Sequence, residues 1–164
     1  MGQAERLRAG EDREPLMLRI VAGLIAAAAA GVWIGTTTEW LSESGGWFET
    51  QELHFVAASA RGALAFVGAF GVCLAWRGRR LAGWLSPFNV APFLGAALFV
   101  AVDYVPNTVA YYRQFAADLP PGYVARDVLA FAVHVAVFGL FALLIFRVIV
   151  TLASWWAPPA PGSV

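Results

Sequence analysis

Three side chains that can bind a ligand fall inside stretches of sequence that are otherwise apolar. His54 and Arg61 lie in HFVAASARGALAFVGAFG, residues 54 to 71, and His134 lies in VLAFAVHVAVFG. A guanidinium binds carboxylate or phosphate groups through paired hydrogen bonds. Two imidazoles can supply the axial ligands of a b-type haem, and an arginine can neutralise a haem propionate. These residue types therefore allow an anion, a quinone oxygen or a haem to be bound.

The composition indicates that these residues lie in a membrane protein. Of the 164 residues, 60% are hydrophobic and 13% are charged, whereas a soluble domain holds about 25% charged residues. The formal net charge is zero, which gives no reason to expect a nucleic-acid partner. The single cysteine, Cys73, excludes an intrachain disulfide and predicts a small buried hydrophobic residue.

Four apolar stretches are long enough to cross a bilayer, which needs about 20 residues per helix. They run from about 16 to 35, 53 to 76, 81 to 105 and 128 to 156. We predict an all-α integral membrane protein, with one four-helix transmembrane domain over residues 16–156. Residues 1–15 are expected to form a cytoplasmic segment, and residues 157–164, APPAPGSV, a disordered tail.

The distribution of arginine predicts the orientation, because short loops rich in basic residues stay in the cytoplasm. Arginines gather in the N-terminal segment and in the RGRR turn at residues 77–80. The first loop, residues 36–52, carries four glutamates and no basic residue. Both termini are therefore expected in the cytoplasm, and the protein in a cytoplasmic (inner) membrane of the bacterial type.

The third span is less regular than the others. Ser86 before Pro87 is typical of a helix start, and Pro92 should kink the helix. After Pro106, the apolar residues of segment 107–119 fall on one stripe. That pattern predicts a short amphipathic helix in the third, outer loop, ended by the PPG at residues 120–122.

Arg61 is expected in the outer third of the bilayer, about 13 Å inward from Glu52 at 1.5 Å per residue. A helical projection gives its span a face of mostly small residues and an opposite face of larger ones. The first face holds His54, Ala58, Arg61, Ala65, Gly68 and Val72, and the second Val56, Ala63, Phe66, Val67, Phe70 and Leu74. Small residues let helices approach, and an arginine facing lipid costs at least about 2.5 kcal/mol. We therefore expect the face of Arg61 to point into the bundle.

Arg61 can be interpreted in two ways, as a structural residue or as a ligand contact. In the first, the side chain leans outward and pairs with water, Glu49, Glu52 or Asp103, so that it only holds helices in register. In the second, it contacts a carboxylate, a phosphate, a haem propionate, a quinone oxygen or a transported anion.

The two histidines bear on the second interpretation. Counted from the outer ends of their spans, His134 lies about 10 Å deep and His54 about 3 Å deep. One iron does not easily bridge this difference of about 7 Å. A histidine in a span also commonly hydrogen-bonds a neighbouring helix or lines a polar cavity.

Several classes of enzyme are excluded for lack of residues. The chain has no HExxH, GxSxG, CxxC or phosphate-loop motif and no lysine for Schiff-base chemistry. Three hypotheses remain. The first is an accessory or anchoring subunit of a larger membrane complex, for example an energy-converting one. The second is a haem- or quinone-binding protein that uses His54, Arg61 and His134, and the third is a small oligomeric transporter or channel with Arg61 as an anion contact. We favour the first, with the lipid bilayer and partner subunits, or further copies of the chain, as partners. We expect no catalytic residue and no metal site.

Overall fold

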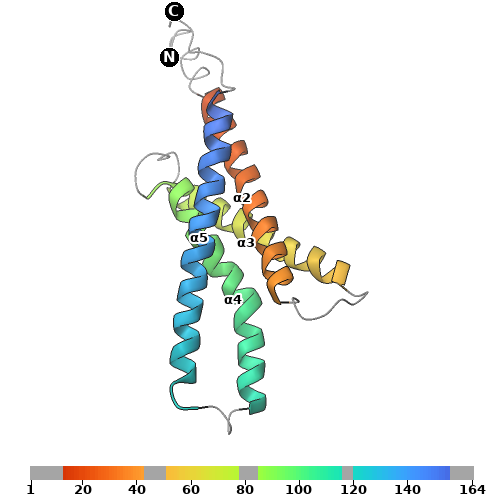
Figure 1. Cartoon of the computed structure of the whole chain (residues 1–164). Coiled ribbons are helices and arrows are strands. Elements are labelled where there is room, and N and C mark those ends of the chain that lie inside the picture. The colour runs from red at the N-terminus through yellow and green to blue at the C-terminus, as the bar shows by residue number, and fades with distance from the viewer. Residues whose placement is uncertain (1–12, 43–50, 78–84, 116–119, 156–164) are drawn as a thin grey trace, which may run out of the picture.

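The protein consists of four long α-helices in the part of the chain that the structure describes, which is residues 13–42, 51–77, 85–115 and 120–155. In this computed structural model the helices are α2 (Arg13–Ser42), α3 (Gln51–Arg77), α4 (Pro87–Phe115) and α5 (Tyr123–Trp155) (Figure 1). Each contains a stretch long and apolar enough to cross a membrane. The predicted all-α fold with four helices of membrane-spanning length is confirmed, and within these residues no strand occurs.

The predicted N-terminal segment and C-terminal tail lie almost wholly outside the residues that the structure describes. Of the expected cytoplasmic segment 1–15, only residues 13–15 are described, and they form the first turn of α2. The expected disordered tail 157–164 lies outside the described residues.

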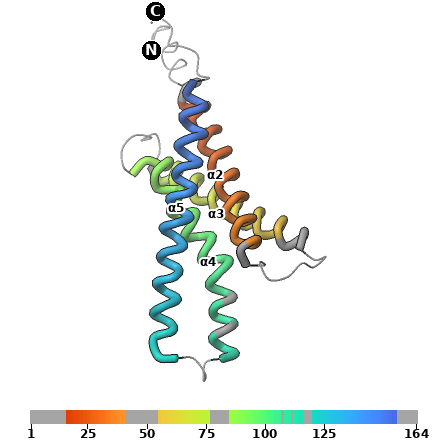
Figure 2. The backbone as a smooth tube through the Cα atoms, in the orientation of Figure 1, coloured from red at the N-terminus to blue at the C-terminus, as the bar shows by residue number. Residues whose placement is uncertain are grey.

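The helices form a ring in which α2 and α4 each pack against both α3 and α5. No Cα atom of α3 comes within 8 Å of one of α5 among the described residues. The start of α2 and the end of α5 lie at one end of the bundle, called here the terminal end (Figures 1 and 2). The end of α4 and the start of α5 lie at the opposite end, called here the hairpin end, and α3 runs obliquely across the other helices.

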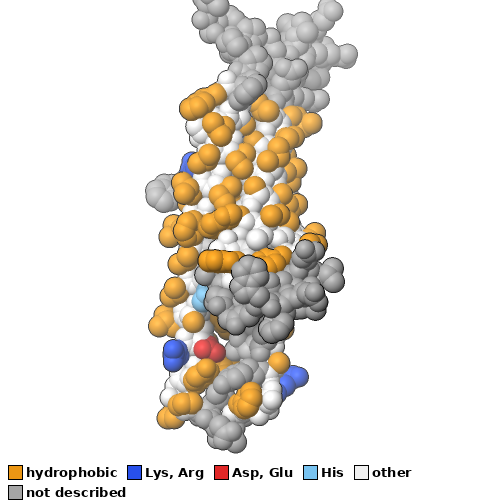
Figure 3. Space-filling model, turned by 45° about the vertical axis from the view of Figure 1, so that its right-hand side comes forward, with side chains coloured by type: hydrophobic (Ala, Val, Ile, Leu, Met, Phe, Trp, Pro, Cys, Tyr) orange, Lys and Arg blue, Asp and Glu red, His pale blue; other side chains and the backbone are white. Residues whose placement is uncertain are grey.

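The outside of the bundle is largely apolar. In Figure 3, hydrophobic side chains cover the visible face along most of its length, and the acidic and histidine side chains in view lie toward the hairpin end. The most apolar helix, α5, has only 11% of its most hydrophobic stretch buried inside the bundle. This surface suits a hydrocarbon solvent better than water.

Phenylalanine rings fill the core by packing against glycines of neighbouring helices. Phe66 and Phe70 of α3 are fully buried. A Cβ atom added at Gly95 of α4 would overlap the ring of Phe66, and one added at Gly23 of α2 would overlap the ring of Phe70. These glycines therefore leave room for the rings at the helix contacts.

Where α2 crosses α3, the two backbones touch. A Cβ atom at Gly31 would overlap the Gly62 carbonyl, and one at Gly35 would overlap the Ala58 carbonyl. Gly31 and Gly35 on α2, like Ala58 and Gly62 on α3, are four residues apart. This small-xxx-small spacing lets membrane helices approach closely.

The predicted inward face of α3 is partly wrong. Ala58 is buried as expected, but Gly68 and Val72 are exposed, while Phe66 and Phe70 of the supposedly outer face are fully buried. The reason is that large rings on α3 fit glycines on α2 and α4. The size of a side chain therefore did not decide which face is buried. Cys73 is buried, as predicted.

Two helices, α2 and α4, run well past the C-terminal ends that the sequence suggested. α2 continues through residues 36–42, where the Thr36 and Thr38 hydroxyls donate to the carbonyls of Val32 and Ile34, at 2.8 and 2.7 Å. Polar threonines thus bond within the helix instead of opening a loop.

α4 begins at Pro87, as predicted, and continues through Pro106 to Phe115. Prolines are tolerated inside membrane helices, where neighbouring groups satisfy the freed backbone atoms. Residues 107–115 of the expected amphipathic helix are therefore the last turns of α4, and residues 116–119 lie outside the described part. A separate helix in the outer loop stays a prediction.

Candidate functional site

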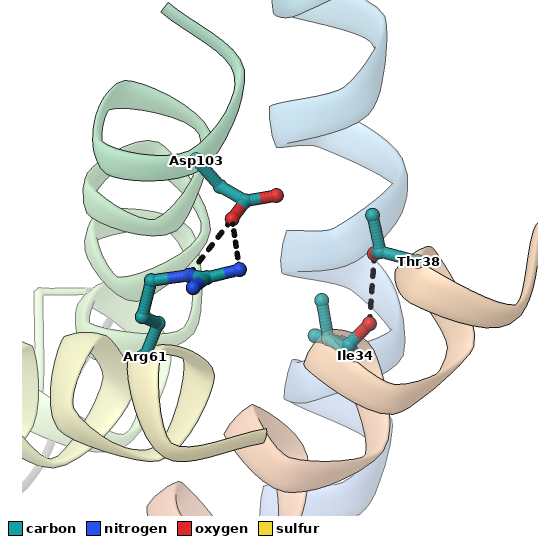
Figure 4. Close-up of polar contacts among 4 residues, drawn as sticks. All are labelled: Ile34, Thr38, Arg61 and Asp103. Carbon is teal, nitrogen blue, oxygen red and sulfur yellow. Dashed lines mark hydrogen bonds and ion pairs between the residues drawn. The ribbon is translucent and has the colours of Figure 1, made fainter. Parts of the chain in front are cut away.

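An ion pair joins α3 to α4. Nε of Arg61 donates to Oδ1 of Asp103 at 2.9 Å, and Nη2 forms an ion pair with the same oxygen, also at 2.9 Å (Figure 4). Arg61 lies six residues after Phe55, the first residue of the apolar stretch of α3, which is about 9 Å along the helix. Of the three carboxylates considered from the sequence, the structure shows Asp103 as the partner.

The ion pair lies at the side of the bundle and is not enclosed by it. The side chain of Arg61 is 41% exposed and that of Asp103 16% exposed. Gly68 and Val72, further along the same face of α3, are exposed as well. The expectation that Arg61 is hidden among the helices is therefore only half met, because its carboxylate partner is inside the protein while its face of α3 is uncovered.

The residue next to Asp103 contacts a different helix. The ring centroid of Tyr104 lies 5.0 Å from that of His134 on α5. Nδ1 of His134 lies 2.7 Å from the carbonyl oxygen of Ala130. Because a carbonyl only accepts, Nδ1 carries the proton, and in the neutral ring Nε2 is then an acceptor.

Hydroxyl groups extend this network to α2. The hydroxyls of Thr36 and Ser59 lie 2.7 Å apart and link α2 to α3. Polar contacts in this part of the bundle thus connect all four helices.

The structure brings two of the three predicted site residues to the same part of the bundle. Arg61 and His134 are connected through the consecutive residues Asp103 and Tyr104. His54 lies in the first turns of α3, but its side chain is outside the described residues. Binding of a haem or quinone by His54, Arg61 and His134 therefore stays a prediction. Among the described residues, no group of three His, Cys, Asp or Glu side chains is placed to hold a metal ion.

A second arginine within a span has a neutral partner. Nη2 of Arg147 on α5 donates to Oδ1 of Asn89 on α4, at 2.6 Å. This contact lies near the start of α4, whereas Asp103 and Tyr104 lie in its second half. The two arginines therefore belong to separate sites.

Sequence reasoning missed Tyr104, Thr36 and Asn89. An aromatic residue near a span end is typical of the membrane interface, so Tyr104 gave no signal of an inward contact. Thr36 was assigned to a loop. Asn89 follows the Ser86–Pro87 helix start and has no spacing that marks it as a partner of Arg147.

Comparison with known proteins gives no relative on which to base a function. The sequence matches no protein-family model, and it matches neither a curated protein nor a solved structure. The fold and the site together define a four-helix bundle of membrane-spanning length with an ion pair at its side.

Proposed function

We propose that the protein is a small accessory or anchoring subunit of a larger membrane complex, and that the outward face of α3 is its contact surface. This contact face comprises Arg61, Leu64, Gly68, Gly71 and Ala75, all of them exposed. The observation that carries the proposal is that two glycines and a half-exposed arginine share one uncovered side of a membrane helix.

The glycines of the contact face differ from those inside the bundle. No atom lies within 4 Å of a Cβ added at Gly68 or Gly71, whereas the same test at Gly31 and Gly62 meets the neighbouring backbone. Small residues on membrane helices allow a partner helix to approach closely, since packing rather than hydrophobicity drives association in lipid. Gly68 and Gly71 thus offer to another protein the kind of surface that α2 and α3 use for each other.

The exposed guanidinium supports the same conclusion. Charged side chains within membrane spans almost always face protein or water, because lipid solvates them poorly. Asp103 compensates the charge of Arg61, but the arginine remains 41% exposed. A partner helix on the contact face would remove this exposed part from lipid and offer its own acceptor to Nη1.

The location that we propose is a bacterial-type inner membrane with the terminal end in the cytoplasm. The arginine-rich N-terminal segment and RGRR turn support this orientation, as does the acidic first loop. The outer loop between α4 and α5 would then lie on the opposite side of the membrane.

The proposal is tested by replacing a glycine of the contact face and a small residue elsewhere. A tagged Gly71→Leu variant is compared with Ala136→Leu, which places the same side chain on an exposed position of α5. After purification from native membranes in mild detergent, the wild type and Ala136→Leu are expected in one defined complex, and Gly71→Leu alone. Equal recovery of that complex from both variants would contradict the assignment of the face.

One observation favours a second candidate, a quinone- or haem-binding protein. In the neutral ring of His134, Nε2 is an acceptor, and no hydrogen bond to it is observed among the described residues. It is therefore available to a ligand hydroxyl or an iron. A visible absorption band that His134→Ala removes would favour this candidate over an accessory subunit.

A further inference from the structure

Arg61 and Arg147, which both lie inside described helices, differ in how their charge is compensated. Arg61 has the carboxylate of Asp103 at 2.9 Å. Arg147 has no carboxylate within 4.0 Å among the described residues, and the partner that it contacts, Asn89, carries no charge. Arg147 is exposed on the outside of α5. An uncompensated cation therefore faces the surroundings of the bundle at this point.

The contact with Asn89 fixes the level of the Arg147 guanidinium in the bundle. Asn89 is the third residue of α4, and its backbone N–H, like that of Val90, donates to the Ser86 carbonyl, at 3.0 Å, where the chain enters the helix. Trp76, near the end of α3, is 74% exposed. Because α3 ends and α4 begins here, and exposed tryptophan is typical of a membrane interface, this level lies near a membrane boundary.

The helix that carries Arg147 continues beyond this level. Eight further residues lead to Trp155, which is about 12 Å along α5, and most of them are apolar. Arg147 thus lies well before the end of α5, in a part of the helix whose side chains are mostly apolar. A cation in such a place requires an anion that can reach it from the edge of the bilayer.

We propose that Arg147, oriented by Asn89, binds the phosphate group of an anionic phospholipid. A guanidinium presents several N–H donors in one plane, a geometry suited to phosphate oxygens. The hydrogen bond to Asn89 uses Nη2, so the other nitrogens keep donors for the phosphate. The charge of the lipid compensates Arg147 as Asp103 compensates Arg61.

The headgroup should be anionic rather than zwitterionic. The amine of a zwitterionic headgroup would bring a second cation close to the guanidinium, and the two would repel. In the proposed orientation this site faces the cytoplasmic leaflet, whose surface potential is negative because it holds anionic lipid. The site needs no partner protein, so it does not depend on the contact face of α3.

The test measures lipid bound to the purified, delipidated protein by native mass spectrometry. Phosphatidylglycerol is titrated against wild type, Arg147→Gln and Arg147→Lys, with Arg126→Gln as the control on the same helix near the hairpin end. We expect the affinity to fall about tenfold in Arg147→Gln and by less in Arg147→Lys, because lysine keeps the charge but loses the planar set of donors. Arg126→Gln should bind as the wild type does.

Three outcomes would overturn the proposal. They are equal binding by wild type and Arg147→Gln, equal affinity for phosphatidylcholine, and full displacement of the lipid by millimolar inorganic phosphate, which would mark a site for free phosphate. If Arg147→Gln does not fold, Asn89→Leu replaces it. That variant keeps the charge, and loss of orientation alone should weaken phosphatidylglycerol binding severalfold; unchanged binding would equally contradict the proposal.

Discussion

Oδ1 of Asp103 accepts a hydrogen bond from Nε of Arg61 and lies 2.9 Å from Nη2 of the same guanidinium. The next residue, Tyr104, contacts His134 on the other side of α4. Because successive residues of a helix point about 100° apart, this pair of neighbours ties α4 to α3 and to α5 at one level. Two consecutive residues of α4 thus connect it to two neighbouring helices.

Removing one partner of the ion pair should cost more than removing both. Asp103→Asn leaves the Arg61 charge uncompensated, and we expect a loss of about 1 kcal/mol in unfolding free energy, limited by the exposure of the arginine. Arg61→Gln combined with Asp103→Asn should recover much of this loss. Denaturation of the single and double variants in detergent measures the coupling. Additive effects would show that the pair does not fix the helices.

The backbone contact between α2 and α3 should tolerate no side chain. Gly62→Leu places a side chain against the Gly31 carbonyl, and overpacking of this kind costs about 1–3 kcal/mol. Gly68→Leu on the same helix meets open space, so its effect on the stability of the isolated protein should be small. Thermal unfolding in detergent compares the two variants. Equal losses of stability would contradict the observed crossing.

The buried face of α3 can be tested with two apolar residues of that helix. Phe66→Ala opens a cavity in the core and should cost about 3–5 kcal/mol. Leu64, two positions away, is 74% exposed, and Leu64→Ala should change the unfolding free energy little. A larger loss of unfolding free energy in Leu64→Ala than in Phe66→Ala would contradict the observed buried face of α3.

A hydrogen bond holds α4 and α5 together at the hairpin end. The Tyr112 hydroxyl donates to Oδ2 of Asp127 at 2.7 Å, and the Tyr112 ring lies edge-on to Tyr123. Tyr112→Phe removes the bond and keeps the ring, so this end of the bundle should open more readily. Hydrogen exchange at the start of α5 should become faster in this variant. Tyr123→Phe, which keeps the bond, is the control, and equal exchange rates in the two variants would contradict this account.

The sequence predicted the number of helices because each span alone has enough apolar residues to cross a membrane. It also placed Arg61 and His134 at similar levels, since the rise per residue of a helix is fixed. It could not predict the buried face of α3. Whether Phe66 points inward depends on Gly95 opposite it, and no local pattern shows which residues of two helices meet. Because the sequence does not show which helix faces meet, it gave Asp103 only as one of three possible partners of Arg61.

The central claim, that α3 offers its outward face to another protein, is tested most directly by photo-crosslinking in native membranes. A photoreactive amino acid is placed at Gly71 on the contact face or at Ala136 on the exposed side of α5. We expect the probe at position 71 to give a discrete crosslinked protein band that the probe at position 136 does not give. Crosslinks only to lipid from position 71, or the same band from both positions, would contradict the account.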